Sequence, residues 1–141
     1  MSRLKFDYVK LGPYKRPIIP VRLTYGDNSV NTQALIDSGA DFNVFHLSFA
    51  KDLGLNLNMN KRITFGGVGN KKQNLTGYLG VLDLMIYSKG ENIEFSTPIV
   101  FSEDIPSNGI PLLGETGFFD HLEEIHFYYK RGKIVLQDKF N

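Results

Sequence analysis

The chain lacks cysteine altogether, and this absence removes several kinds of chemistry at once. Without thiols there are no disulfides, no thiolate nucleophile and no cysteine-ligated zinc site. The three histidines, His46, His121 and His126, do not stand at the spacing of metal ligands. We therefore expect neither a metal site nor a cofactor.

Long apolar runs and a charge excess are also missing. No apolar run approaches the ~20 residues that a membrane-spanning helix needs. Sixteen basic residues stand against fifteen acidic ones, a net charge of +1, so overall charge gives no reason to propose nucleic acid or a membrane as partner. The N-terminus carries charge where a signal peptide would need an apolar stretch. We expect a cytoplasmic protein.

What the chain does contain is typical of one small globular domain over residues 1–141. Its apolar content of 42% is normal for a folded protein, and its length suits a single core. Short alternating stretches separated by turn residues predict an all-β fold with one or two short helices. Strands are expected at residues 4–8, 19–25, 30–36, 62–65, 75–87, 93–99, 125–129 and 134–136. Helical spacing is expected at 46–53, ending at Gly54, and again as one or two turns within 114–122.

The stretch Ala34–Val44 stands out because an apolar run ends abruptly in Asp37, Ser38 and Gly39. Gly39 is expected to allow backbone angles that a side chain would forbid. Asp37 would then lie at the end of a strand, between the apolar Ile36 and Ala40. A carboxylate that is partly shielded from water by apolar neighbours is suited to proton transfer. The same three residues are also ordinary turn chemistry.

Three stretches in order carry a family resemblance. Asp37-Ser38-Gly39-Ala40-Asp41 resembles the active-site segment of the retropepsins. The glycine-rich residues 63–70 resemble their flap tip, and Ile110-Pro111-Leu112-Leu113-Gly114 resembles their second apolar-apolar-glycine strand. The retropepsins are retroviral-type aspartic peptidases. The resemblance covers about residues 17–136 and implies a closed β-barrel with a flap hairpin. The segment before Pro17 has no counterpart in it.

The resemblance also implies roles for individual residues. Asp37 would be the catalytic acid and base, and the Ser38 hydroxyl would brace two active-site loops across a dimer axis. Gly39 would hydrogen-bond the substrate backbone, and Ala40 and Asp41 would line the adjoining subsites. The flap-tip residues expected to lie over the substrate are Gly66, Gly67, Val68 and Gly69. A floppy hairpin loop is the plainer interpretation of these glycines.

The number of catalytic aspartates in the chain indicates that a second copy of the chain is needed. Aspartic peptidases need two carboxylates that share one proton, and this chain has a single Asp-Ser-Gly. A two-fold axis that places Asp37 opposite its copy would supply the second one. The resemblance therefore implies a homodimeric endopeptidase that acts on a peptide or protein substrate.

Two points stay open from the sequence. The chain has Glu115 after Gly114, where many relatives carry arginine or another polar residue, so the family's usual salt bridge to Asp41 is in doubt and repulsion is expected instead. The alternative function is a catalytically silent module that keeps the fold and binds peptides or dimerises.

Overall fold

The computed structural model describes residues 2–57, 61–66 and 74–138 of the chain. Within these ranges it has twelve β-strands, one α-helix and a 3-10 turn. The all-β class with short helical pieces is confirmed.

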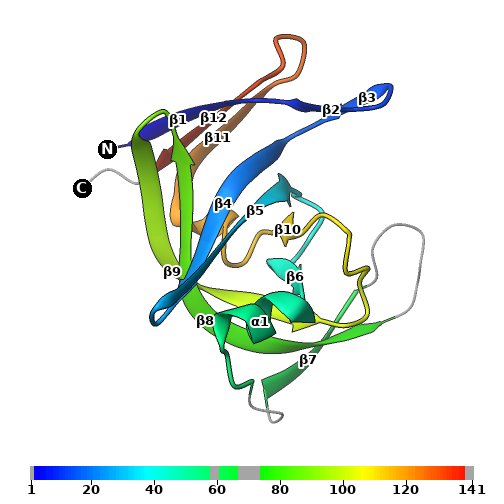
Figure 1. Cartoon of the computed structure of the whole chain (residues 1–141). Helices are drawn as coiled ribbons and strands as arrows, with labels where there is room; N and C mark the ends of the chain where they lie inside the picture. The colour runs from blue at the N-terminus through cyan, green and yellow to red at the C-terminus, as the bar shows by residue number, and fades with distance from the viewer. Residues whose placement is uncertain (1, 58–60, 67–73, 139–141) are drawn as a thin grey trace.

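The larger sheet positions the expected site. Its strands, in spatial order, are β4 (Ile18–Tyr25), β5 (Asn28–Ile36), β10 (Leu112–Leu113), β6 (Val44–His46), β9 (Glu91–Ser102), β8 (Leu75–Ser88) and β7 (Arg62–Phe65). β4 also pairs with β8, so the strands from β4 round to β8 form a ring (Figure 1).

A parallel pair of strands lies at the centre of this arrangement. β10 pairs with β5 through Leu112 opposite Leu35 and Leu113 opposite Ile36. On its other side β10 meets β6 in antiparallel fashion. The last residue of β5 is therefore held beside the last residue of β10, and Asp37 and Gly114 follow them directly.

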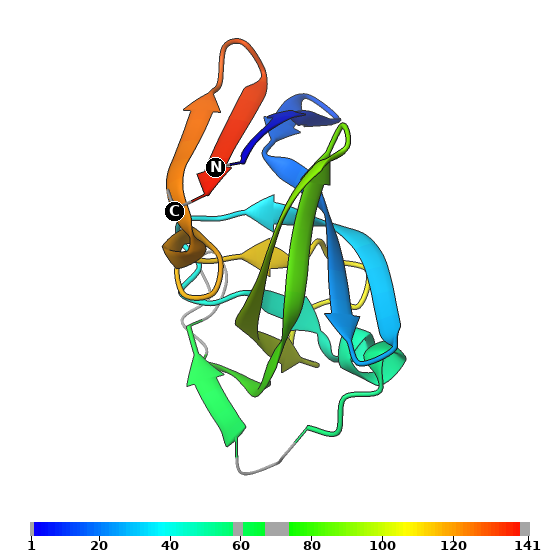
Figure 2. The same cartoon turned by 90° about the vertical axis from the view of Figure 1, so that its left-hand side faces the viewer.

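A smaller antiparallel sheet is built from both ends of the chain. Its strands are β1 (Arg3–Asp7), β12 (Lys133–Asp138) and β11 (Leu122–Tyr128). The next two strands, β2 (Val9–Leu11) and β3 (Tyr14–Arg16), make a separate hairpin. The segment before Pro17 thus forms β1 and this hairpin, and Figure 2 shows β1 alongside the hairpin of β11 and β12.

Alternating apolar residues form the core between the layers. Ile19, Val21 and Leu23 are fully buried on one face of β4, while Tyr25, which the same alternation predicts to be inward, is exposed at the turn. Leu82, Leu84 and Ile86 of β8 are buried as the alternation predicts. Each such side chain stabilises the fold by roughly 1.5–3 kcal/mol relative to an exposed one.

The predicted helix is α1 (Leu47–Leu53). His46 caps its first turn by accepting the Ser48 backbone N–H at 3.1 Å, and Gly54 ends it with a left-handed φ of 76°. Both the position and the terminating glycine agree with the sequence. No helix among the described residues is long and apolar enough to cross a membrane.

Of the one or two helical turns expected within 114–122, the structure has one, the 3-10 turn η2 (Phe119–His121). The residues before it are taken by other partners, because the backbone N–H groups of Glu115 and Thr116 bond to Ala40 and Asp41. Gly117 then has a φ of 107°, which interrupts any helix.

Candidate active site

Asp37 follows β5 directly and its backbone is held on both sides. Its N–H donates to the Leu113 carbonyl at 2.9 Å, and its own carbonyl accepts from the Ala40 N–H at 3.1 Å. The side chain is half-buried, whereas Ser38 and Gly39 beside it are exposed. The carboxylate is therefore presented at the end of a buried strand on a loop that faces outward.

The carboxylate is oriented by its own turn. Oδ1 of Asp37 accepts the backbone N–H of Gly39 at 2.9 Å, as in an Asx turn. No ion pair among the described residues includes Asp37. The acid thus has a fixed direction without a basic side chain that would neutralise it.

The reason for glycine at position 39 differs from the one expected. Gly39 lies outside the positive-φ region, so its backbone angles do not require glycine. A Cβ there would come within 3.2 Å of Oδ1 of Asp37. The glycine therefore leaves room beside the carboxylate.

The segment that follows β10 braces the loop through its backbone. The N–H groups of Glu115 and Thr116 donate to the carbonyls of Ala40 and Asp41, each at 2.9 Å. Gly114 lies so close to the loop that a Cβ would come within 2.3 Å of the Phe42 carbonyl oxygen. Glycine is required at this position for steric reasons.

Asp41 and Glu115 themselves are exposed, and neither takes part in an ion pair among the described residues. The family salt bridge that the sequence places in doubt is therefore missing from this part of the chain. Backbone hydrogen bonds between the two segments hold them together instead.

Asn43 is a residue whose role the sequence did not reveal. Its side chain is fully buried; Oδ1 accepts the Gly114 N–H at 3.0 Å and Nδ2 donates to the Pro98 carbonyl at 3.3 Å. Its backbone carbonyl accepts the Val100 N–H at 2.8 Å. One buried amide thus links the Asp37 loop, the Gly114 strand and β9.

The hairpin expected to form a flap has both of its arms. β7 and β8 pair antiparallel from Arg62 opposite Tyr78 to Phe65 opposite Leu75. Gly66 is exposed at the end of β7, while Gly67, Val68 and Gly69 lie outside the described residues.

The end of β8 nearest the loop of this hairpin is tied to the end of β9. Oδ2 of Asp104 accepts the Thr76 N–H at 2.9 Å, and the Ser102 hydroxyl donates to the Thr76 carbonyl at 2.6 Å. Gly77 packs tightly against β9, since a Cβ there would come within 2.4 Å of Cγ1 of Val100. These contacts hold the β8 arm of the hairpin against β9 close to the loop.

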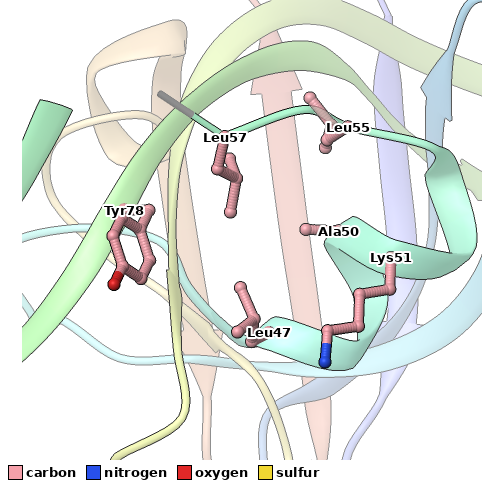
Figure 3. Close-up of a pocket in the computed structure, with 6 residues that line it drawn as sticks. All are labelled: Leu47, Ala50, Lys51, Leu55, Leu57 and Tyr78. Carbon is pink, nitrogen blue, oxygen red and sulfur yellow. The ribbon is translucent and has the colours of Figure 1, made fainter. Parts of the chain in front are cut away.

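A pocket of about 250 Å³ lies elsewhere, between α1 and β8. Its lining residues, drawn in Figure 3, are Leu47, Ala50, Lys51, Leu55, Leu57 and Tyr78. None of the residues that the sequence assigns to the site lines it. Among the described residues, no group of three or more acidic or histidine side chains is placed to hold a metal ion.

Comparisons with known proteins show which solved structures the fold is similar to. No protein-family model and no curated protein matches the sequence. A crystal structure of a retropepsin-like aspartic protease from Rickettsia conorii is similar, with a TM-score of 0.60 at 12% identity, over 96% of this chain and 91% of that one. The fold is retropepsin-like.

A structure of EIAV protease complexed with the inhibitor HBY-793 is also similar, with a TM-score of 0.43 at 23% identity over 76% of this chain and 88% of that one. The Rickettsia conorii protein is matched along nearly its whole length. At such low identity the likeness concerns the retropepsin-like fold alone, so chemistry has to be argued from the residues of this chain.

Proposed function

We propose that the chain is an aspartic endopeptidase that works as a symmetric homodimer, with one Asp37 from each copy. The observation that carries this proposal is the position of Asp37 in a retropepsin-like fold. It stands at the end of β5, beside β10, in the sequence Asp37-Ser38-Gly39.

The setting of the carboxylate supports a catalytic role. Its Oδ1 is oriented by the Gly39 N–H, and the loop is braced by Leu113, Glu115 and Thr116 through backbone bonds. Such bracing limits the movement of a reacting group and so lowers the reorganisation that a reaction would need.

The need for a second copy follows from the chemistry. Hydrolysis by this mechanism uses two carboxyl groups, one ionised and one protonated. Asp41 is the nearest acid along the chain, but its backbone is tied to Thr116 and its side chain is exposed. The exposed face formed by Ser38 and Gly39 is where a second copy would bring its own Asp37.

In the proposed reaction the ionised carboxylate takes a proton from a water molecule as its oxygen attacks the scissile carbonyl carbon. The protonated carboxyl of the other copy donates its proton to the carbonyl oxygen, giving a neutral tetrahedral gem-diol. In the collapse of that intermediate, the acid that took the proton from water gives it to the departing nitrogen, the other acid takes a proton from one gem-diol hydroxyl, and the C–N bond breaks as the C=O bond of the new carboxyl group forms. One proton stays shared between the two acids at the end of the cycle.

The β7–β8 hairpin would serve as the lid. Its two paired arms, with β8 held against β9, would support a connecting loop that covers the substrate and excludes water. In this proposal residues 66–69 lie over the bound peptide, with Gly39, Ala40 and Asp41 on the opposite side.

The test is cleavage of a mixed peptide library by the wild type, by Asp37→Asn and by Asp27→Asn. Asp27 is exposed in the turn between β4 and β5, so its variant makes the same chemical change at the other end of β5. We expect cleavage by the wild type and Asp27→Asn but none by Asp37→Asn. Circular dichroism should be the same for all three. Cleavage by Asp37→Asn would rule the assignment out, and a wild type that cleaves no peptide would favour the silent module.

A further inference from the structure

Two hairpin turns meet at one end of the molecule. The turn between β2 and β3 and the turn between β11 and β12 both project away from α1 and β7 (Figure 1). Nζ of Lys15 lies 4.1 Å from the ring centroid of Tyr129 and donates to the Tyr129 carbonyl. The rings of Tyr8 and Tyr129 meet edge to face at 5.7 Å. These contacts join the turns into one unit, which we call the tip surface: residues 7–16 and 128–133.

The tip surface is strongly basic although the chain is nearly neutral. It carries six basic residues and one acid, Asp7, for a net charge of +5. Since the whole chain has a net charge of +1, the other residues sum to −4. The basic residues are Lys10, Lys15, Arg16, Lys130, Arg131 and Lys133.

Large apolar side chains stand at the extremity of the same surface. Leu11 is 44% exposed, Tyr14 is 61% exposed and Tyr129 is 59% exposed. Leu11 and Tyr14 are the strand residues on either side of the first turn, and Tyr129 lies in the second turn together with Lys130 and Arg131. Apolar groups and positive charges thus lie side by side at the two turns.

We propose that the tip surface binds the surface of an anionic lipid membrane. Basic residues are attracted to anionic headgroups, and tyrosine is favoured where the headgroups meet the acyl chains. Leu11 and Tyr14 would enter this boundary while the cations on the surface, led by Lys130 and Arg131, meet the headgroup charge. Lys133 is paired with Asp7, and Lys15 donates to the Tyr129 carbonyl. The protein would bind peripherally, through two turns and without a spanning segment.

A lipid surface fits better than nucleic acid for two reasons. The guanidinium of Arg16 lies 4.9 Å from the Tyr14 ring centroid, and that of Arg131 lies 4.5 Å from the Tyr128 ring centroid. These cations cover ring faces on which bases would have to stack. Leu11, which leads the first turn, cannot stack on a base but gains by leaving water for lipid.

The first experiment is co-sedimentation of the full chain with vesicles. One set is phosphatidylcholine alone, and the other also contains phosphatidylserine. We expect binding to the second set only, weakened by added salt. Lys130→Glu/Arg131→Glu should reduce the binding by roughly tenfold or more. The control Lys51→Glu/Lys61→Glu makes the same change in net charge at exposed positions in α1 and beside β7, and should bind like the wild type.

A second experiment asks whether the turn enters the lipid. The chain has no tryptophan, so Leu11→Trp introduces a unique reporter, and Tyr25→Trp does the same at the exposed turn between β4 and β5. With phosphatidylserine vesicles, Trp emission should shift to the blue and be quenched by brominated lipid in Leu11→Trp alone. Circular dichroism of every variant checks the fold.

Three results would overturn the proposal. One is equal loss of binding in the two double-charge variants, which would indicate attraction by overall charge. Another is tight binding of a single-stranded oligonucleotide that Lys130→Glu/Arg131→Glu abolishes while vesicles are not bound. The third is a reporter at position 11 that stays in water on bound vesicles.

Discussion

Asn43 accepts the backbone N–H of Gly114 through its side-chain oxygen, 3.0 Å away and fully buried. This bond joins the segment that follows β5 to the one that follows β10. The same amide donates to Pro98 in β9. Three separate parts of the chain thus meet on one side chain, directly behind the loop that carries Asp37.

We predict that Asn43→Ala destabilises the protein and loosens this loop. The substitution leaves the buried Gly114 N–H without its acceptor, which costs about 1–3 kcal/mol, and it removes a donor from the part-buried Pro98 carbonyl. The free energy of unfolding should fall by about 2–4 kcal/mol, measured by urea denaturation.

The matched control is Asn31→Ala, which removes an exposed side-chain hydrogen bond to Arg22 and should change stability by less than about 1 kcal/mol. Peptide cleavage by folded Asn43→Ala, measured at low temperature, should fall as well. Unchanged stability and activity would show that the amide does not support the loop.

Substitutions at two glycines of the β7–β8 hairpin should have different effects on stability. At Gly77 a Cβ would come within 2.4 Å of Val100, so Gly77→Ala should cost about 1–3 kcal/mol of stability. At Gly66 a Cβ would meet nothing within 4 Å, so Gly66→Val should leave the thermal midpoint unchanged.

Turnover supplies the second readout for this hairpin. If residues 66–69 close over substrate, Gly66→Val should still reduce the rate of peptide cleavage, because a branched side chain stiffens and crowds the closing segment. Full activity in Gly66→Val would mean that this end of the hairpin is only a connection.

Local patterns in the sequence were enough to predict several of these features. The alternation of apolar residues predicts β4 and β8, and Gly54 predicts the end of α1, because each depends on neighbours along the chain. The position of Asp37 at the end of β5 follows in the same way. Its role remains a proposal.

What the sequence could not reveal depends on contacts between distant segments. Nothing near Asn43 indicates that its amide would be buried against Gly114 and Pro98. The sequence around Gly77 does not indicate that Val100 of β9 would lie so close to this residue. The net charge of the chain does not reveal the tip surface, because acidic residues elsewhere offset its basic residues. The two segments of the tip surface also come together only in the folded chain.

The pH dependence of the small sheet can be predicted from Asp7. The hydrogen bond and charge of Lys133 lower the pKa of Asp7 below its usual value of 3.8, linking β1 to β12. A lowered pKa contributes stability above the unfolded value, and that contribution is lost as pH falls through the folded value. Asp7→Asn should therefore lower the thermal midpoint slightly at neutral pH, and the difference should vanish in strong acid. A difference that grew in acid would contradict this sign.

The last prediction concerns the dimer. If each active site needs one Asp37 from each copy, specific activity should fall when the enzyme is diluted below its dissociation constant. Sedimentation over the same concentrations should show dimers giving way to monomers.

Mixing subunits makes the same prediction quantitative. When wild-type and Asp37→Asn chains are refolded together in equal amounts, about half of the wild-type chains should pair with an inactive partner. Activity per wild-type chain should then fall to about one-half, and further with excess variant. Refolding with Asp27→Asn chains, which keep Asp37, should cause no such loss. A monomer that remains fully active through the dilution series would eliminate the shared site, because one Asp37 cannot be both the base that activates water and the acid that protonates the carbonyl.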